Sequence, residues 1–263
     1  MDFNAIVRAQ VDIFSLGTDV NRTLCPLGSA VVSGTDARYY KNTFYPLERG
    51  FRYAPSDVAQ LEAFYESRGR DGCLLDCVGQ FAGHGFSTCA AIHVPYLGGV
   101  AVGSRDFACV RTFDIDAYCR VYVQADPNME LEPFKARTTN LVEHRDTRLF
   151  LFRSGNETIG AGSLVSVGDD VYMANGFSIR KEFRGGILSR ARWIRLATES
   201  DVIGLTSTKF ARALVRAIDG ATIRGTCEFV RISSVRGQVA GQLSVAGTAP
   251  QTQAGENAAV MLG

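Results

Sequence analysis

The chain lacks an excess of charge of either sign. Its 263 residues include 28 basic and 27 acidic side chains, which gives a formal net charge of +1. A protein that binds DNA, RNA or an anionic membrane surface usually has a strong positive field, and this chain has none overall. We therefore expect no nucleic acid and no membrane among its partners.

Long apolar runs are also missing. No stretch approaches the roughly 18 uninterrupted apolar residues that a membrane-spanning helix needs. The N-terminal sequence MDFNAIVRAQVDIF has acidic residues where a secretory signal has basic ones. The seven cysteines are an odd number and are widely scattered, which favours reduced thiols over a disulfide framework. These features predict a cytoplasmic protein.

The length and the apolar content favour two domains over one. The glycine-rich stretch GGVAVGSRD near residue 100 marks the expected boundary between them. We predict a first unit over residues 1–100 and a second over residues 107–233. The remaining residues, 234–263, are mostly Gly, Ala, Gln, Thr and Val without periodicity, which predicts a flexible tail.

The first unit has few clear elements. Residues 1–55 are rich in turn formers and aromatic residues, so little regular structure can be placed there. Ser56 is the expected cap of a helix over residues 57–68, which has an apolar face at helical spacing. Two apolar segments, 73–78 and 85–97, are expected to be strands.

The second unit is more regular. Residues 111–123 fit either a strand or a helix start, and residues 132–144 fit a helix. Short Gly/Asn/Asp turns join the next apolar segments, which is typical of an antiparallel meander. The expected strands are 148–153, 157–167, 170–179, 201–207 and 225–233, and the expected helices are 187–200 and 209–219. This order predicts an α/β (α+β) fold with a central sheet that carries helices.

The most informative segment joins a strand that ends near Ile179 to a helix that begins at Ile187. Arg184, Gly185 and Gly186 form the turn between them. Glycines let the backbone approach a phosphate closely, and the first N–H groups of a helix have no partner inside the helix. The turn is therefore a candidate anion site, and an ordinary surface turn before a helix remains the alternative.

The segment NGFSIRKEFRGGILSRARWIRLA resembles the strand, basic turn and helix of the GCN5-related N-acetyltransferases (GNAT superfamily). The preceding segment LFLFRSGNETIGAGSLVSVGDDVYM is similar to the strands before that motif. LEAFYESRG, HGF and HVPYL, within residues 61–97, resemble a tandem-domain subgroup in which a degenerate N-terminal unit lacks the cofactor cradle. Together these likenesses cover most of residues 40–233.

The resemblance implies two acyl-CoA N-acyltransferase-like units, each with a mixed, mainly antiparallel sheet flanked by helices, and one cofactor site per chain. It implies an N-acetyltransferase that moves an acetyl group from acetyl-CoA to a primary amine, here of a small molecule. The strand from Asn175 would hydrogen-bond the pantetheine arm, and the turn would hold the pyrophosphate. The cofactor-binding residues so implied are Phe177, Ser178, Ile179, Arg184, Gly185, Gly186, Ile187, Leu188 and Ser189. The oligomeric state stays open, a homodimer included.

The chain also departs from the family pattern. Its RGGIL turn is one residue shorter than the family's loop, and the helix over 209–219 has no Tyr, the family's usual proton donor to the thiolate. A non-catalytic acyl-CoA-binding or interaction module on the same fold is therefore the alternative. Asp170 and Tyr172 are the candidate catalytic residues, and the alternative for Asp170 is a plain hairpin turn.

One cluster has the residue types of a zinc site. Cys73, Cys77, His84, Cys89 and His93 lie close together in the sequence. Their spacers are apolar and resemble strand interior, and free cysteines are among the most buried residues in proteins. We expect core positions and no metal.

Overall fold

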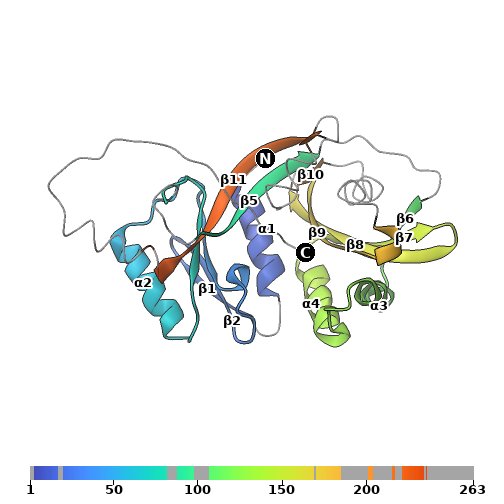
Figure 1. Cartoon of the computed structure of the whole chain (residues 1–263), viewed down its shortest axis with the longest axis horizontal. Coiled ribbons are helices and arrows are strands. Elements are labelled where there is room, and N and C mark those ends of the chain that lie inside the picture. The colour runs from blue at the N-terminus through green and yellow to red at the C-terminus, as the bar shows by residue number, and fades with distance from the viewer. Residues whose placement is uncertain are drawn as a thin grey trace. The chain divides into compact units, whose positions relative to one another are not determined.

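The computed structural model describes residues 3–16, 20–81, 88–97, 107–168, 170–184, 201–203, 215–216, 221–233 and 235. The chain forms two compact units. The C-terminal unit contains residues 1–18 and 93–225, and the N-terminal unit contains residues 19–92 and 226–261. Each has a mixed, mainly antiparallel sheet with helices (Figure 1), which confirms the predicted fold class.

The sheet of the C-terminal unit begins with an antiparallel meander. Its strands are β6 (Phe107–Thr112), β7 (Thr147–Ser154), β8 (Glu157–Gly168) and β9 (Val171–Ile179). Next comes β10 (Asp201–Ile203), which pairs in parallel with β9. On its other edge, β10 pairs with β5 (Thr88–Leu97) in the antiparallel direction. The three strands β7, β8 and β9 confirm the predicted meander.

Successive side chains of β7 point to opposite faces of this sheet, as in any β-strand. Phe150 and Phe152 belong to one apolar cluster, and Leu149 and Leu151 belong to another on the opposite face. Helices α3 (Ile115–Ala125) and α4 (Leu131–His144) cover the second face (Figure 1). The segment 111–123 thus contains both a strand end and a helix, and α4 confirms the helix predicted over 132–144.

Helix α1 (Phe3–Ser15) packs in the C-terminal unit, although it opens the chain. It contacts β8 and β9, and its apolar residues from Ile6 to Phe14 are buried. Arg145, just after α4, donates to the Asp12 carboxylate, with the Nε–Oδ2 distance at 2.7 Å. The Asn140 side chain donates to the Leu16 carbonyl at 3.3 Å. These contacts tie α1 to α4.

The N-terminal unit has its own sheet. The antiparallel strands are β1 (Val20–Cys25), β2 (Gly28–Ser33) and β3 (Thr43–Pro46). β4 (Cys73–Asp76) is parallel to β3, and helix α2 (Pro55–Glu66) connects the two. The strand beside β4 is β11 (Thr222–Arg231), which places Glu228 opposite Asp76. α2 packs its Val58 and Tyr65 into the core of this unit.

The two units differ from the predicted ranges 1–100 and 107–233 at both ends. Residues 1–18 belong with the later unit because α1 buries its apolar face there. Residues 226–231 belong with the earlier unit because they complete its sheet beside β4. Of the predicted tail 234–263, the structure describes only Val235, which is buried.

Most of the elements missed by sequence analysis lie in residues 1–55, where α1, β1, β2 and β3 form. The predicted cap of α2 was also wrong. Ala54 is the N-cap residue, and its N–H donates to the Asp57 carboxylate at 2.8 Å. Among the described residues no helix is long and apolar enough to cross a bilayer.

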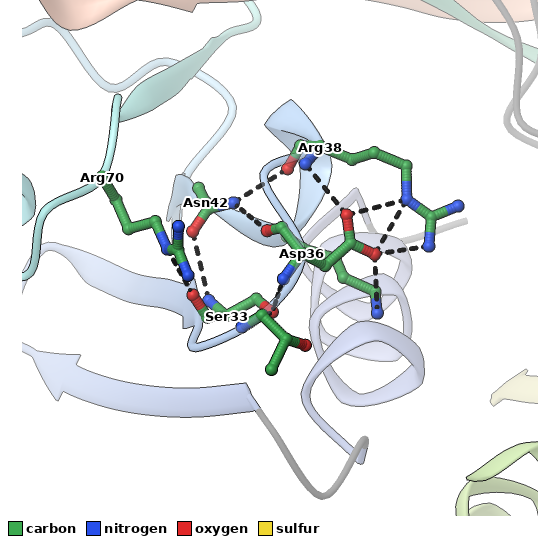
Figure 2. A network of polar contacts seen from close by, with 7 residues as sticks. Ser33, Asp36, Arg38, Asn42 and Arg70 are labelled. Atoms are coloured by element: carbon green, nitrogen blue, oxygen red, sulfur yellow. Dashed lines mark hydrogen bonds and ion pairs between the residues drawn. The ribbon is translucent and has the colours of Figure 1, made fainter.

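A polar network holds the connection between β2 and β3 (Figure 2). The Asp36 carboxylate accepts from Arg38 and forms an ion pair with Lys41 at 3.0 Å. Asn42 accepts from the Ser33 N–H at 3.1 Å, and Arg70 donates to the Ser33 carbonyl at 2.7 Å. The network fixes this loop to the strand ends and to the segment after α2.

Candidate functional site

One edge of β9 pairs with a described strand only at its start. The parallel pairing with β10 joins Val171 to Asp201 and ends with Met173 opposite Ile203. Beyond Met173, none of the strands that the structure describes pairs with this edge, while β8 covers the other edge. An open strand edge offers N–H and C=O groups to an extended ligand. The sequence motif that resembles the family begins on this open edge.

A β-bulge lies in the middle of the open segment. Gly162 of β8 pairs with Phe177 of β9. The next residue of β8, Ser163, pairs with Asn175, so Gly176 has no residue opposite it. Gly176 has a φ of 64°, in the left-handed region that glycine enters without strain.

The bulge changes which side chains face the core. Tyr172 and Ala174 lie in one apolar cluster before the bulge, and Phe177 and Ile179 lie in the same cluster after it. Without the extra residue, the alternation would have pointed Ser178 into that cluster instead. The bulge therefore keeps an apolar core and leaves the backbone of residues 174–179 at the open edge.

Three predicted cofactor-binding residues lie on this strand. The Phe177 ring stacks on Phe152 with 5.5 Å between centroids, above Gly162, where a Cβ atom would clash with it. Ser178 and Ile179 are both buried. Because their side chains are buried, a ligand at this edge would contact the backbone of these residues.

Arg184 ends the described part of the motif. After β9, a 3₁₀ turn over Lys181–Phe183 brings its guanidinium back to the end of the strand. Its Nε donates to the Ile179 carbonyl at 2.6 Å, and its Nη2 donates to the Ala125 carbonyl at 2.8 Å. Ala125 is the last residue of α3, and a cation is favoured at a helix C-terminus. Arg184 thus joins β9 to α3.

The other predicted pyrophosphate residues, Gly185, Gly186, Ile187, Leu188 and Ser189, lie outside the described residues. Their role stays a prediction. The structure brings the described members of the set, Phe177 to Arg184, together at one end of β9.

Asp170 and Tyr172 lie at the other end of the strand. Asp170 is exposed in the turn between β8 and β9 with a φ of 55°, as the hairpin alternative expects. Tyr172 is buried, and its hydroxyl lies 3.4 Å from the Asp146 carboxylate. Burial raises the pKa of Tyr172. From Tyr172 to Ile179 the strand spans roughly 20 Å, so these two residues and the basic turn form separate groups.

The cysteine and histidine cluster does not form a metal site in the described part of the chain. Cys73 and Cys77 are buried free thiols, and no group of three or more potential ligands gathers there. A hydrogen bond with the Cys227 thiol, together with burial, raises the pKa of Cys77. The side chains of His84, Cys89 and His93 lie outside the described residues.

The N-terminal unit has the order of strand, Arg-Gly segment, helix and parallel strand that the sequence predicts for the C-terminal unit. There, β3 leads through Arg49 and Gly50 into α2, and β4 returns parallel to β3. At the start of α2, Pro55 has no N–H, and the Asp57 carboxylate accepts from the Ala54 N–H. A carboxylate at a helix N-terminus occupies the place of an anion and repels another one. The N-terminus of α2 is therefore unfavourable for a phosphate.

No protein-family model matches the chain, and no curated protein matches its sequence. Similarity appears only at the level of structure.

Solved structures share the fold. A GCN5-related N-acetyltransferase from Kribbella flavida matches with a TM-score of 0.58 at 13% sequence identity, over 88% of this chain and 96% of that protein. A tandem GNAT protein from the clavulanic acid biosynthesis pathway matches with a TM-score of 0.53 at 12% identity, over 87% of this chain and 95% of its own length. A conserved protein of unknown function from Staphylococcus epidermidis matches at 0.52 and 16% identity, over 81% and 93% of the two chains.

These matches extend over more of the chain than either compact unit contains, so both units take part in the similarity. The chain therefore has the fold of the GCN5-related N-acetyltransferases in its tandem form.

Proposed function

We propose that this protein is an acetyl-CoA-dependent N-acetyltransferase that acts on a primary amine of a small molecule. The observation that carries the proposal is the bulge of β9 at Gly176, on the strand that leads directly to the basic turn at Arg184. The fold shared with GCN5-related N-acetyltransferases supports it. The described cysteines are free, which supports a reducing compartment such as the cytoplasm.

Each part of acetyl-CoA would meet a different part of the motif. The amide groups of the pantetheine arm would bind the backbone of Phe177 and Ser178 at the open edge. The pyrophosphate would bind the N–H groups from Gly185 to Ser189, where glycines allow close approach and the sequence predicts the start of a helix. Arg184 uses two of its five N–H groups on carbonyls, and the guanidinium charge would favour the phosphates.

The reaction needs the amine in its neutral form. The amine nitrogen attacks the thioester carbonyl carbon, the C–N bond forms, and the C–S bond breaks to release the CoA thiolate. The new amide loses one proton and the thiolate gains one. Asp170 and Tyr172 lie at the start of β9, away from the bulge, so we assign these proton transfers to water in this proposal.

The second candidate is a non-catalytic acyl-CoA-binding module. It is favoured by the RGGIL turn, one residue shorter than the family's loop, and by the absence of a Tyr from residues 209–219. A short loop offers fewer N–H groups, and a missing acid slows departure of the thiolate. The two candidates share the binding site and differ in turnover.

The test has two steps. Thermal shift with acetyl-CoA reports binding, and thiol release with ethanolamine, spermidine, an aminoglycoside and an α-amino acid reports transfer. We expect a raised melting temperature and thiol release with at least one amine. Binding without thiol release would favour the module, and no binding would reject both.

A further inference from the structure

A buried polar group links helix α3 to the bulge of β9. The Ser163 hydroxyl, on β8, donates to the Asn175 carbonyl, and the Asn175 Nδ2 group lies 3.3 Å from the same Ser163 oxygen. Tyr118, on α3, interacts with Ser163, and burial raises the pKa of the Tyr118 hydroxyl. Tyr118 and Ser163 are almost fully buried, at 2% and 1% exposed.

Ser163 and Asn175 are joined by two hydrogen bonds. A serine hydroxyl has one proton to donate and two lone pairs that accept. The Ser163 proton goes to the Asn175 carbonyl, and one lone pair accepts from Asn175 Nδ2. These buried bonds hold the two residues in one arrangement, because a shift would leave polar atoms unpaired.

A bulge needs such support. The extra residue interrupts the ladder between β8 and β9, so backbone groups beside it lose their regular partners. Here the Asn175 carbonyl takes the Ser163 hydroxyl as its partner, next to Gly176 with its left-handed φ. Tyr122, also on α3, lies against the bulge. A Cβ atom added to Gly176 would lie 3.0 Å from the Tyr122 hydroxyl oxygen.

We propose that Tyr118, Ser163 and Asn175 are positioning residues that fix the bulge of β9, and with it the backbone that would hold the pantetheine arm and its thioester. This inference rests on the proposed acetyltransferase function. The three side chains act through the β9 backbone and do not touch the substrate. Loss of the Ser163 hydroxyl loosens residues 174–179 and misplaces the thioester, while the basic turn still holds the phosphates.

The first measurement uses the free protein. In Ser163→Ala, amide hydrogen exchange over residues 174–179 should become about tenfold faster. Tyr118→Phe, which keeps the ring, should give a smaller change of the same kind. The matched control is Ser29→Ala, an equally buried serine on β2 of the N-terminal unit. Unchanged exchange in β9, or equal acceleration throughout the C-terminal unit, would overturn the positioning role.

The second measurement uses the amine that gives the fastest thiol release. Ser163→Ala should lower kcat about tenfold and change the Kd for CoA less than about threefold. Ser163→Thr, which restores the hydroxyl, should recover most of kcat, and Ser29→Ala should match the wild type. Equal loss of kcat in both alanine variants would overturn the inference. If the wild type has no turnover, the proposed function fails, and hydrogen exchange alone still decides the positioning role.

Discussion

At the residue scale, Gly176 is the position of β9 that least tolerates a side chain. Its φ of 64° is unfavourable for other residues, and a Cβ atom would press on Tyr122. Gly155, in the hairpin between β7 and β8, is a matched control, because its φ is 57° and nothing lies within 4 Å of the added Cβ. Gly155→Ala should destabilise by about 1 kcal/mol, the cost of the left-handed backbone alone.

Gly176→Ala should destabilise by about 2 to 3 kcal/mol, since crowding against Tyr122 adds to the backbone strain. Urea denaturation of both variants measures the difference. Equal destabilisation would mean that Tyr122 yields easily and that the bulge is not tightly enclosed.

Asp36 gives a pH-dependent prediction for the N-terminal unit. Burial alone would raise the pKa of this carboxyl, but hydrogen bonds from Arg38 and Lys41 outweigh it and lower the pKa below its ordinary value of 3.8. The folded state therefore holds the ionised form, so this contribution to stability is full above about pH 4 and is lost as the pH falls further.

Asp36→Asn should lower the free energy of unfolding by about 1 kcal/mol at pH 7, a modest value because Arg38 is exposed to solvent. The difference between variant and wild type should shrink as the pH falls below about 4. Urea denaturation at pH 7 and pH 3 tests this. A difference that stays constant between the two would show that the carboxylate charge does not contribute.

At the element scale, Arg184 connects the end of β9 to the end of α3. Arg184→Lys keeps the charge but loses the planar guanidinium group, whose two nitrogens donate to the Ile179 and Ala125 carbonyls at the same time. The variant should lose about 1 kcal/mol of stability without any ligand present. The neighbouring Arg180 pairs with the half-exposed Glu157, so Arg180→Lys should lose less.

Thermal denaturation without acetyl-CoA measures both arginine variants. If Arg184→Lys matched the wild type in stability and lost only acetyl-CoA affinity, the carbonyl contacts would be incidental to the fold. Loss of both properties would show that one side chain serves the fold and the site.

Sequence reasoning succeeded for elements with a clear period. The alternation in β7 and the apolar face of α4 placed both elements close to their observed bounds. It failed where local signals conflict. α2 begins at Pro55 with Ala54 as its N-cap, and the Asp57 carboxylate accepts from the Ala54 N–H, although Ser56 is the better cap by residue type. Inside β9, the Asn-Gly pair at 175–176 signals a bulge, but only the pairing register with β8 shows which side chains turn inward.

At the scale of the whole molecule, no local pattern could show that residues 1–18 and 226–261 belong to units far from them in sequence. α1 is joined to the end of α4 by the hydrogen bond from Arg145 to Asp12, and β11 pairs with β4. Both are long-range contacts, so the sequence indicated two units and their fold but not their limits. The resemblance supplied the proposed cofactor, and the Asp57 carboxylate at the N-terminus of α2 supplied a physical reason to expect a single site.

The central claim is that the chain binds one acetyl-CoA, at the turn that begins with Arg184. Isothermal titration calorimetry with acetyl-CoA tests it on the wild type, on Gly185→Asp and on Gly50→Asp. Gly50 occupies the corresponding Arg-Gly turn of the N-terminal unit and has open space around it, so its variant is a matched control.

We predict one molecule bound per chain in the wild type and in Gly50→Asp. In Gly185→Asp we predict affinity at least about 100-fold weaker, because a carboxylate there repels the pyrophosphate. Two molecules per chain, no binding to the wild type, or unchanged affinity in Gly185→Asp would contradict the account.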